Sequence, residues 1–156
     1  MEEVTCMAEL ADVLRPLAQL LAYVPLDDPA AARAEIEARA PFGRQPVEGI
    51  RAVALAAAQA GWLVPREKGG IRFGRVCKEL CGFSVDAVLM DKPGPRHRHP
   101  NGEIDLCITT RGDARFDGQQ EGWVVYGPDS AHVPTVSGGE MLILYFLPEG
   151  AIDFEG

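Results

Sequence analysis

The sequence predicts a mainly β protein, an antiparallel barrel or sandwich preceded by an N-terminal bundle of about three helices. Up to about residue 65, alanine, leucine and glutamate recur in helical spacing. After Lys68-Gly69-Gly70 the chain changes to short β-rich pieces separated by glycine, proline and aspartate, a pattern typical of antiparallel barrels and sandwiches. We therefore expect a helical segment over residues 1–66 that packs on a β-barrel domain over residues 67–156.

Three helices are expected in the first segment. Apolar side chains between Leu10 and Leu21 recur at steps of three and four residues, which predicts an amphipathic helix. Asp27-Asp28-Pro29 supplies a capping carboxylate and a proline at the first position of a helix over 30–40. The third helix runs from about 46 to 60 and stops at Gly61. A winged helix is the alternative fold, disfavoured because these helices lack the basic face that DNA contact requires.

Turn residues divide the second segment into short candidate strands. Glycine, proline and aspartate recur between runs of β-branched and aromatic residues. The expected strands are Ile71–Val76, Phe83–Met90, Glu103–Thr109, Gly122–Tyr126, Ala131–Val136, Met141–Leu147 and Ile152–Phe154.

Composition excludes several classes of function. The net charge is −8 over 156 residues, so neither nucleic acid nor an anionic membrane surface is an expected partner. No apolar run is long enough to cross a membrane, and the start Met-Glu-Glu lacks the pattern of a secretory signal. The four cysteines match no zinc-finger or redox spacing. We expect a cytoplasmic protein with reduced, mostly buried thiols.

All three histidines belong to one constellation. His97 and His99 are two apart, so on an extended strand they face the same side. Residues 100–102, Pro-Asn-Gly, predict a tight turn, after which Glu103 should open the antiparallel neighbouring strand and face back toward both imidazoles. His132 follows a second turn further along. Three imidazoles and a carboxylate suit a divalent transition metal such as Fe, Mn, Zn or Ni.

The strand that begins at Glu103 alternates between polar and aliphatic residues. Its polar set should face a cavity, and the aliphatic set should face the packed side. A buried carboxylate costs several kcal/mol unless it is paired or binds a metal, so this arrangement indicates a site. The polar set is Glu103, Asp105 and Cys107, and the aliphatic set is Ile104, Leu106 and Ile108.

These residues resemble the two motifs of the cupin superfamily. The run HRHPNGE from His97 to Glu103 resembles the first motif, and Gly122, Pro128 and His132 resemble the second. The resemblance implies a jelly-roll β-barrel of the cupin type, with a metal bound inside it by the three histidines and the glutamate. His132 lies one residue nearer its proline than the cupin pattern has it, so a three-ligand site stays an alternative.

The last third of the chain has a more specific resemblance. The stretches HRHPNGEIDLCI and GWVVYGPDSAHVPTVSGGEMLILYFLPEGAIDF resemble a small bacterial family that includes 4-hydroxylaminobenzoate lyase. The resemblance implies an enzyme that converts 4-hydroxylaminobenzoate, a small aromatic substrate, to 3,4-dihydroxybenzoate and ammonia. Two alternatives remain: a non-catalytic cupin that binds a small ligand as a sensor or carrier, and another metallo-cupin enzyme such as a dioxygenase or isomerase.

The same resemblance suggests roles for individual side chains. A bound metal would act as a Lewis acid or activate water, and Glu103 or Asp105 would move the proton. Tyr126 and Tyr145 are candidates to flank the aromatic ring. A barrel with an edge strand and a helical arm further suggests a homodimer.

An arginine is expected to hold the substrate carboxylate as a bidentate pair. Arg96 and Arg98 alternate away from the histidine face. Arg72, Arg75 and Arg111 remain open as candidates.

Overall fold

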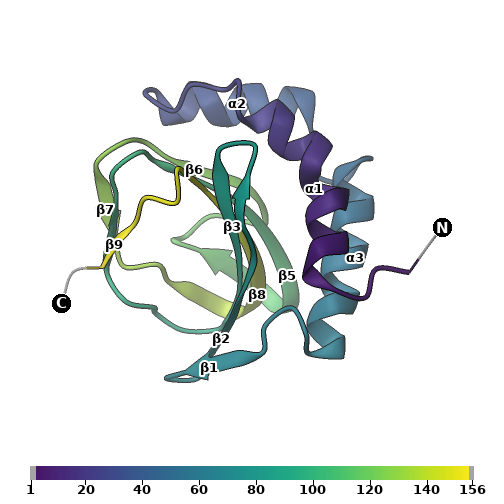
Figure 1. The fold of residues 1–156 in the computed structure, drawn as a ribbon. Coiled ribbons are helices and arrows are strands. Elements are labelled where there is room, and N and C mark those ends of the chain that lie inside the picture. The colour runs from purple at the N-terminus through teal and green to yellow at the C-terminus, as the bar shows by residue number, and fades with distance from the viewer. Residues whose placement is uncertain (1–2, 155–156) are drawn as a thin grey trace.

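Three helices precede two antiparallel sheets (Figure 1). The computed structural model describes residues 3–154. The helices are α1 (Met7–Leu21), α2 (Pro29–Arg39) and α3 (Val47–Ala60). The strands are β1 (Arg66–Lys68), β2 (Ile71–Leu80), β3 (Phe83–Met90), β4 (His97–His99), β5 (Glu103–Phe116), β6 (Gly122–Tyr126), β7 (Ser130–His132), β8 (Val136–Pro148) and β9 (Asp153–Phe154). The predicted fold class, mainly β after about three helices, is confirmed, and the winged-helix alternative is wrong.

The larger sheet has the strand order β1-β2-β3-β8-β5-β6, and the smaller sheet has the order β7-β4-β9. The two sheets share no strand, so the hydrogen-bonded ladder is not continuous around the barrel. Residues of both sheets line one cavity, which lies between them. This cavity holds the candidate site.

The helices form where the sequence predicts them. The side chain of Asp28 accepts a hydrogen bond from the backbone N–H of Ala31 at 3.2 Å, which caps the start of α2. Gly61 ends α3 in the left-handed conformation, with φ of 91°, where a side chain would be strained.

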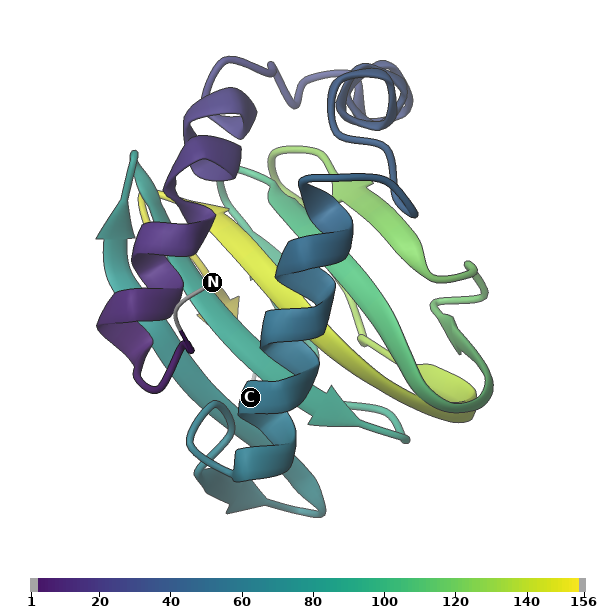
Figure 2. The same ribbon diagram turned by 90° about the vertical axis from the view of Figure 1, so that its right-hand side faces the viewer.

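The helices cover the outer face of the larger sheet (Figure 2). Leu10 and Leu14 of α1 join Leu106 and Phe146 of the sheet in one buried apolar cluster. At the β6 edge of the sheet, the indole N–H of Trp123 donates a hydrogen bond to the carbonyl oxygen of Ala40, which follows α2, at 2.8 Å. The helical segment therefore packs on the sheet opposite the cavity. Its division from the β-domain at residue 66 stays a prediction, and the outer limits at residues 1–2 and 155–156 lie outside the described residues.

The expected hairpin between the histidine strand and the Glu103 strand is wrong. β4 pairs with β7 and β9, whereas β5 pairs with β6 and β8. Residues 100–102 instead carry the chain from the smaller sheet to the larger one. Gly102 has φ of 88°, and a Cβ there would lie 2.8 Å from the carbonyl oxygen of Tyr126. A glycine is needed at this crossing because the backbones approach so closely.

Other strand limits also differ from the expectation. The single strand predicted over Ala131–Val136 is wrong, because β7 ends at His132 and β8 begins at Val136. Pro134 lies in the break and has no N–H to give to a ladder. The short strand β1 was not expected. It pairs with β2, and this register places Lys68 opposite Ile71.

All four cysteines are free thiols, as expected, but only Cys107 is buried. Cys6 is exposed, and Cys77 and Cys81 are partly buried, so the expectation of mostly buried thiols is wrong. Within the described part of the chain, no helix is both long and apolar enough to cross a membrane.

Candidate metal centre

His97, His99, Glu103 and His132 converge on one point at the wall of the cavity. Each offers a ligand atom, and these atoms all lie within 4.8 Å of one another. His97 and His132 are cross-strand partners on β4 and β7, and His99 lies on the same face of β4. Glu103 enters from the other sheet, at the start of β5. The four residues that the sequence predicted as metal ligands are thus brought together.

The Nδ1 atoms of His97 and His99 are both held by hydrogen-bond acceptors. The Nδ1 of His97 lies 3.2 Å from the carbonyl oxygen of Pro95, and the Nδ1 of His99 lies 3.0 Å from the hydroxyl of Ser130. Ser130 donates its own proton to the carbonyl oxygen of Gly127 at 2.6 Å, so toward His99 it can only accept. Both rings therefore carry their proton on Nδ1 and direct the Nε2 lone pair at the cluster.

His132 is held in the same way by a carboxylate. Its Nδ1 lies 2.6 Å from Asp117, which also accepts hydrogen bonds from the Tyr126 hydroxyl and from the backbone N–H of Thr135. Burial opposes the charge of Asp117, but the hydrogen bonds from His132, Tyr126 and Thr135 keep the pKa of this carboxyl below its usual range. An ionised acceptor on Nδ1 leaves Nε2 of His132 free to bind a metal.

The cluster has the features of an acceptor set for a cation. The Nε2 atoms of His97 and His132 lie only 3.1 Å apart. The buried Nε2 of His99 has no hydrogen-bond partner, although it lies 3.2 Å from the Glu103 carboxylate. Lone pairs that face one another at such distances repel unless a positive centre lies between them. The residues present therefore fit a divalent transition metal.

The protonation states of the buried groups suit this interpretation. Burial and the neighbouring imidazoles lower the pKa of His97, so that ring favours its neutral, ligating form. Burial opposes ionisation of Glu103, yet the contacts with His99, Asp105 and His97 hold its pKa below the usual range. Asp105 is the opposite case, because burial and the adjacent Glu103 charge raise its pKa well above the usual range. Glu103 thus supplies the negative charge, and Asp105 holds a proton beside it.

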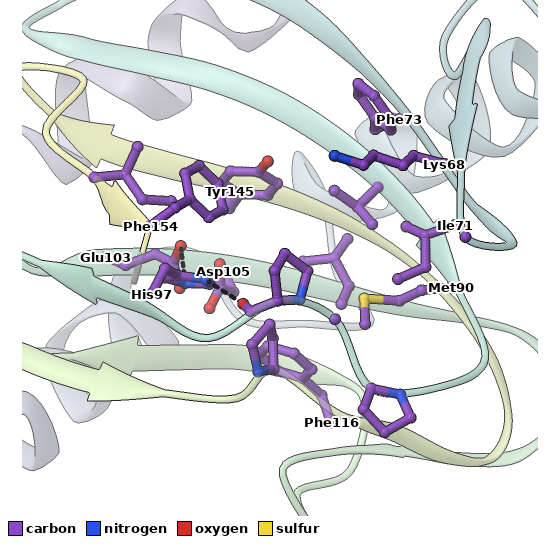
Figure 3. A pocket seen from close by; sticks show the side chains of 18 residues that line it. Lys68, Ile71, Phe73, Met90, His97, Glu103, Asp105, Phe116, Tyr145 and Phe154 are labelled. Atoms are coloured by element: carbon purple, nitrogen blue, oxygen red, sulfur yellow. Dashed lines mark hydrogen bonds and ion pairs between the residues drawn. The ribbon is translucent and has the colours of Figure 1, made fainter. Parts of the chain in front are cut away.

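A cavity of about 610 Å³ opens from the cluster (Figure 3). This volume is in the range of small-molecule sites. The polar lining groups are His97, Glu103, Asp105, Tyr145 and Lys68, and the apolar lining includes Ile71, Phe73, Val88, Met90, Phe116, Ile143 and Phe154.

The two predicted substrate-binding tyrosines lie in different places. Tyr145 lines the cavity, and in Figure 3 its hydroxyl points into it. Tyr126 does not line the cavity. Its ring stacks on His99, with the centroids 5.4 Å apart, and its hydroxyl binds Asp117.

The candidate arginines are not brought to the cavity. None of them is among its lining residues. Arg75 instead pairs with Asp86 at 3.0 Å, and Arg111 pairs with Asp91 at 3.2 Å.

Sequence reasoning missed three residues of the site. Asp117 and Ser130 hold the Nδ1 atoms of His132 and His99 across 15 and 31 residues of sequence, which no local spacing predicts. Lys68 lines the cavity because β1 pairs with β2. The Gly-Gly pair after Lys68 was a usable signal for this hairpin, since two glycines between short β-prone runs are typical of a two-residue turn.

Comparison with known proteins assigns the family. The sequence profile of the PnbB family, 4-hydroxylaminobenzoate lyase, matches residues 17–154. The chain belongs to this family. The resemblance identified from the motifs is thereby confirmed, and it extends into the helical segment.

Two curated relatives of the same name are similar in sequence. The 4-hydroxylaminobenzoate lyase of Nocardioides sp. (strain LMS-CY) is 34% identical over 108 residues, which are 61% of this chain and 64% of that protein. The enzyme of the same name from Pseudomonas putida is 31% identical over 116 residues, 61% of this chain and 66% of that protein. The matches thus span just under two thirds of the length of these relatives.

Solved cupin structures are similar at a lower level. An RmlC-like cupin from Ralstonia eutropha JMP134 is 13% identical and has a TM-score of 0.42, with 57% of this chain and 62% of that chain covered. The cupin-like fold expected for the family agrees with the two antiparallel sheets and with the motif residues that meet between them.

Proposed function

We propose that this protein is a metal-dependent lyase that converts 4-hydroxylaminobenzoate to 3,4-dihydroxybenzoate and ammonia. The observation that carries the proposal is the convergence of three histidine Nε2 atoms and Glu103 at the wall of a cavity of about 610 Å³. Membership of the family and the two relatives named 4-hydroxylaminobenzoate lyase support the choice of substrate.

The proposed reaction balances without an external oxidant or reductant. The ring carbon–nitrogen bond, the nitrogen–oxygen bond and one ring carbon–hydrogen bond break, two ring carbon–oxygen bonds form, and one water is taken up. Nitrogen is reduced as it leaves as ammonia, while one ring carbon is oxidised. The protein therefore has to bind and orient the ring, admit one water and move protons.

The proposed metal ligands are His97, His99, Glu103 and His132. A divalent ion held there, such as Fe, Mn, Zn or Ni, would supply Lewis acidity toward the hydroxylamine oxygen or a bound water. The hydrogen bonds on the three Nδ1 atoms would keep the rings oriented before the substrate arrives.

Two carboxyl groups at the cavity wall are proposed to handle protons. Asp105 lies beside Glu103, and its Oδ2 is buried without a hydrogen-bond partner. A carboxyl group so placed can give a proton to the departing nitrogen or take one from the water. Glu103 is the second proton carrier when it is not fully engaged as a ligand.

The tyrosines receive different proposed roles. Tyr145 lines the cavity and is placed to flank the substrate ring. Tyr126, predicted to do the same, is held against His99 and Asp117 instead, so its contribution would be to keep those groups in position. Cytoplasmic location, homodimeric assembly and the absence of nucleic-acid or membrane partners stay predictions from the sequence.

The test compares metal content and ammonia release in the wild type and in His99→Ala, under anaerobic conditions with 4-hydroxylaminobenzoate. We expect one metal per chain and stoichiometric ammonia in the wild type, and loss of both in the variant. Arg98→Ala is the matched control, because Arg98 is the intervening residue on β4 and pairs with Asp129 and Asp153 outside the cluster. It should retain metal and turnover.

Three outcomes would contradict the proposal. Full turnover by wild-type protein that contains no bound metal would show that the reaction does not need a metal. Unchanged metal content and turnover in His99→Ala would show that the metal site is assigned to the wrong residues. Bound metal without ammonia release would leave a different metallo-cupin enzyme or a ligand-binding cupin, and oxygen consumption with catechols would favour a dioxygenase.

A further inference from the structure

The cavity has two chemically different ends. His97 of β4 and the carboxyls Glu103 and Asp105 of β5 form one end, next to the other two histidines of the cluster. The other end is formed by the β1–β2 hairpin, which contributes Lys68 and Ile71. Strands β2, β3 and β8 separate β1 from β5 in the larger sheet. At the usual strand spacing this places the two backbones about 19 Å apart along the sheet.

Lys68 is the only lysine or arginine among the described residues that line the cavity. Its register opposite Ile71 places it on the same face as the cavity wall. In Figure 3 its side chain extends along the cavity, with the ammonium nitrogen directed toward Tyr145. It forms no ion pair with any residue in the range 3–154, so its charge is available to a ligand.

The Tyr145 hydroxyl is a second donor that lines the same cavity. It makes no hydrogen bond within residues 3–154. Burial raises the pKa of Tyr145 well above its usual range, so the hydroxyl stays protonated and can donate to an anion. Figure 3 shows the hydroxyl and the Lys68 ammonium pointing toward each other.

The charges that line the cavity indicate which group of a substrate would lie at the Lys68 end. The carboxyl side chains of Glu103 and Asp105 line one end of the cavity, whereas the ammonium of Lys68 lines the other. Lys68 therefore offers an organic carboxylate a cation supplied by the protein itself. The walls between the two ends are apolar, with Val88 and Ile143 among them. A flat ring with polar groups at opposite ends matches this order.

We infer that Lys68, together with the Tyr145 hydroxyl, binds the carboxylate of an aromatic acid whose reacting group faces the histidine cluster. The inference rests on the proposed function for the identity of the reacting group. It replaces the arginine expected from the sequence with a lysine from an unpredicted hairpin. Lys68 is in this account a specificity-determining residue, and it takes no part in the bond changes.

The test measures kcat and KM for two substrates, 4-hydroxylaminobenzoate and phenylhydroxylamine, which lacks the carboxylate. Lys68→Met should raise KM for the benzoate by about tenfold, since a charge-assisted hydrogen bond at an exposed side chain is lost. It should leave kcat for the benzoate and both constants for phenylhydroxylamine near their wild-type values. Lys68→Arg should recover most of the lost affinity.

Lys92→Met is the matched control. The Lys92 ammonium lies against Gly70 in the same hairpin, but Lys92 does not line the cavity. Its removal changes the local charge equally and should not distinguish the two substrates. An equal effect of Lys68→Met on both substrates, or an equal effect of both lysine variants, would overturn the inference.

Binding of unreactive compounds separates this inference from the proposed function. Calorimetry with 4-aminobenzoate and with aniline should show a preference for the carboxylate in the wild type that Lys68→Met loses. That preference without ammonia release would support carboxylate binding by Lys68 and contradict the lyase assignment. Ammonia release with no such preference, or no binding and no turnover at all, would overturn carboxylate binding by Lys68.

Discussion

The two faces of β5 differ between residues 103 and 108: one face packs in the apolar core, and the other lines the cavity. Ile104, Leu106 and Ile108 are fully buried against the helices and neighbouring strands. Glu103 and Asp105 are equally buried, but on the face that lines the cavity. Apolar burial stabilises the fold by about 1.5–3 kcal/mol per side chain, whereas an ionised carboxyl costs free energy there unless a partner compensates it. Burial alone therefore does not distinguish a structural position from a functional one.

The cavity face accommodates the carboxyl of Glu103 because imidazole partners surround it. Glu103 has three imidazoles nearby, with contact distances of 3.2 Å to His99 and 3.9 Å to His97 and to His132. The opposite face needs no such partners, since it contains only aliphatic groups. Substitutions one residue apart on this strand should separate activity from stability.

The largest effect is expected for Asp105→Asn on the cavity face. The amide keeps the shape of a protonated carboxyl and cannot transfer a proton, so kcat for 4-hydroxylaminobenzoate should fall by about 10²–10⁴-fold. Metal content and the unfolding midpoint should stay near wild type. Steady-state kinetics with elemental analysis measure this. Asp86→Asn is the control. Asp86 of β3 lies on the same face of the larger sheet as Asp105, but it pairs with Arg75 and does not line the cavity. Wild-type kcat in Asp105→Asn would remove Asp105 from the reaction.

Leu106→Ala should give the converse result on the helix-facing side. The free energy of unfolding should drop by about 2–5 kcal/mol, because a fully buried leucine leaves a cavity in the core. The folded fraction should retain its metal and its kcat. Denaturant titration measures the loss, and the volume-conserving Leu106→Met should cost less than about 1.5 kcal/mol. Loss of bound metal from folded Leu106→Ala would show that the two faces are coupled.

Asp117→Asn should produce the smallest of these effects. The variant weakens the acceptor for His132 Nδ1 and for the Tyr126 hydroxyl, so metal affinity should fall by about 10–100-fold. Competition with a chelator measures this change. Asp129→Asn offers a control, since Asp129 is an exposed carboxylate that pairs with Arg98 outside the cluster. Equal affinities in Asp117→Asn and the wild type would mean that His132 is oriented without this contact.

The sequence predicted the parts of this molecule that depend on local patterning. The predicted helix limits lie within a few residues of the observed ones, because caps and apolar spacing are local signals, as at Asp28 and Gly61. The two faces of β5 followed from alternation alone. The four residues that converge in the candidate metal centre were also predicted to meet, because histidine is rare in this chain and its spacing matches a motif.

Features that depend on pairing between distant segments were missed. The Pro-Asn-Gly turn suggested a hairpin, yet the chain crosses between sheets there, which only the partners of β4 and β5 determine. Asp117 lies fifteen residues from His132, beyond any local pattern. Lys68 reaches the cavity because of the β1–β2 register. The expected arginine anchor failed for a related reason, since acidic partners elsewhere engage Arg75 and Arg111.

The central claim is that three imidazoles and one carboxylate bind a single divalent ion at the end of the cavity. X-ray absorption spectroscopy of the zinc-loaded protein tests it most directly. The account predicts a nitrogen and oxygen shell at about 2.0–2.2 Å, with the outer-shell scattering of three imidazoles, of which one is lost in His132→Ala. A sulfur shell, or two imidazoles in the wild type with no change in His132→Ala, would contradict it.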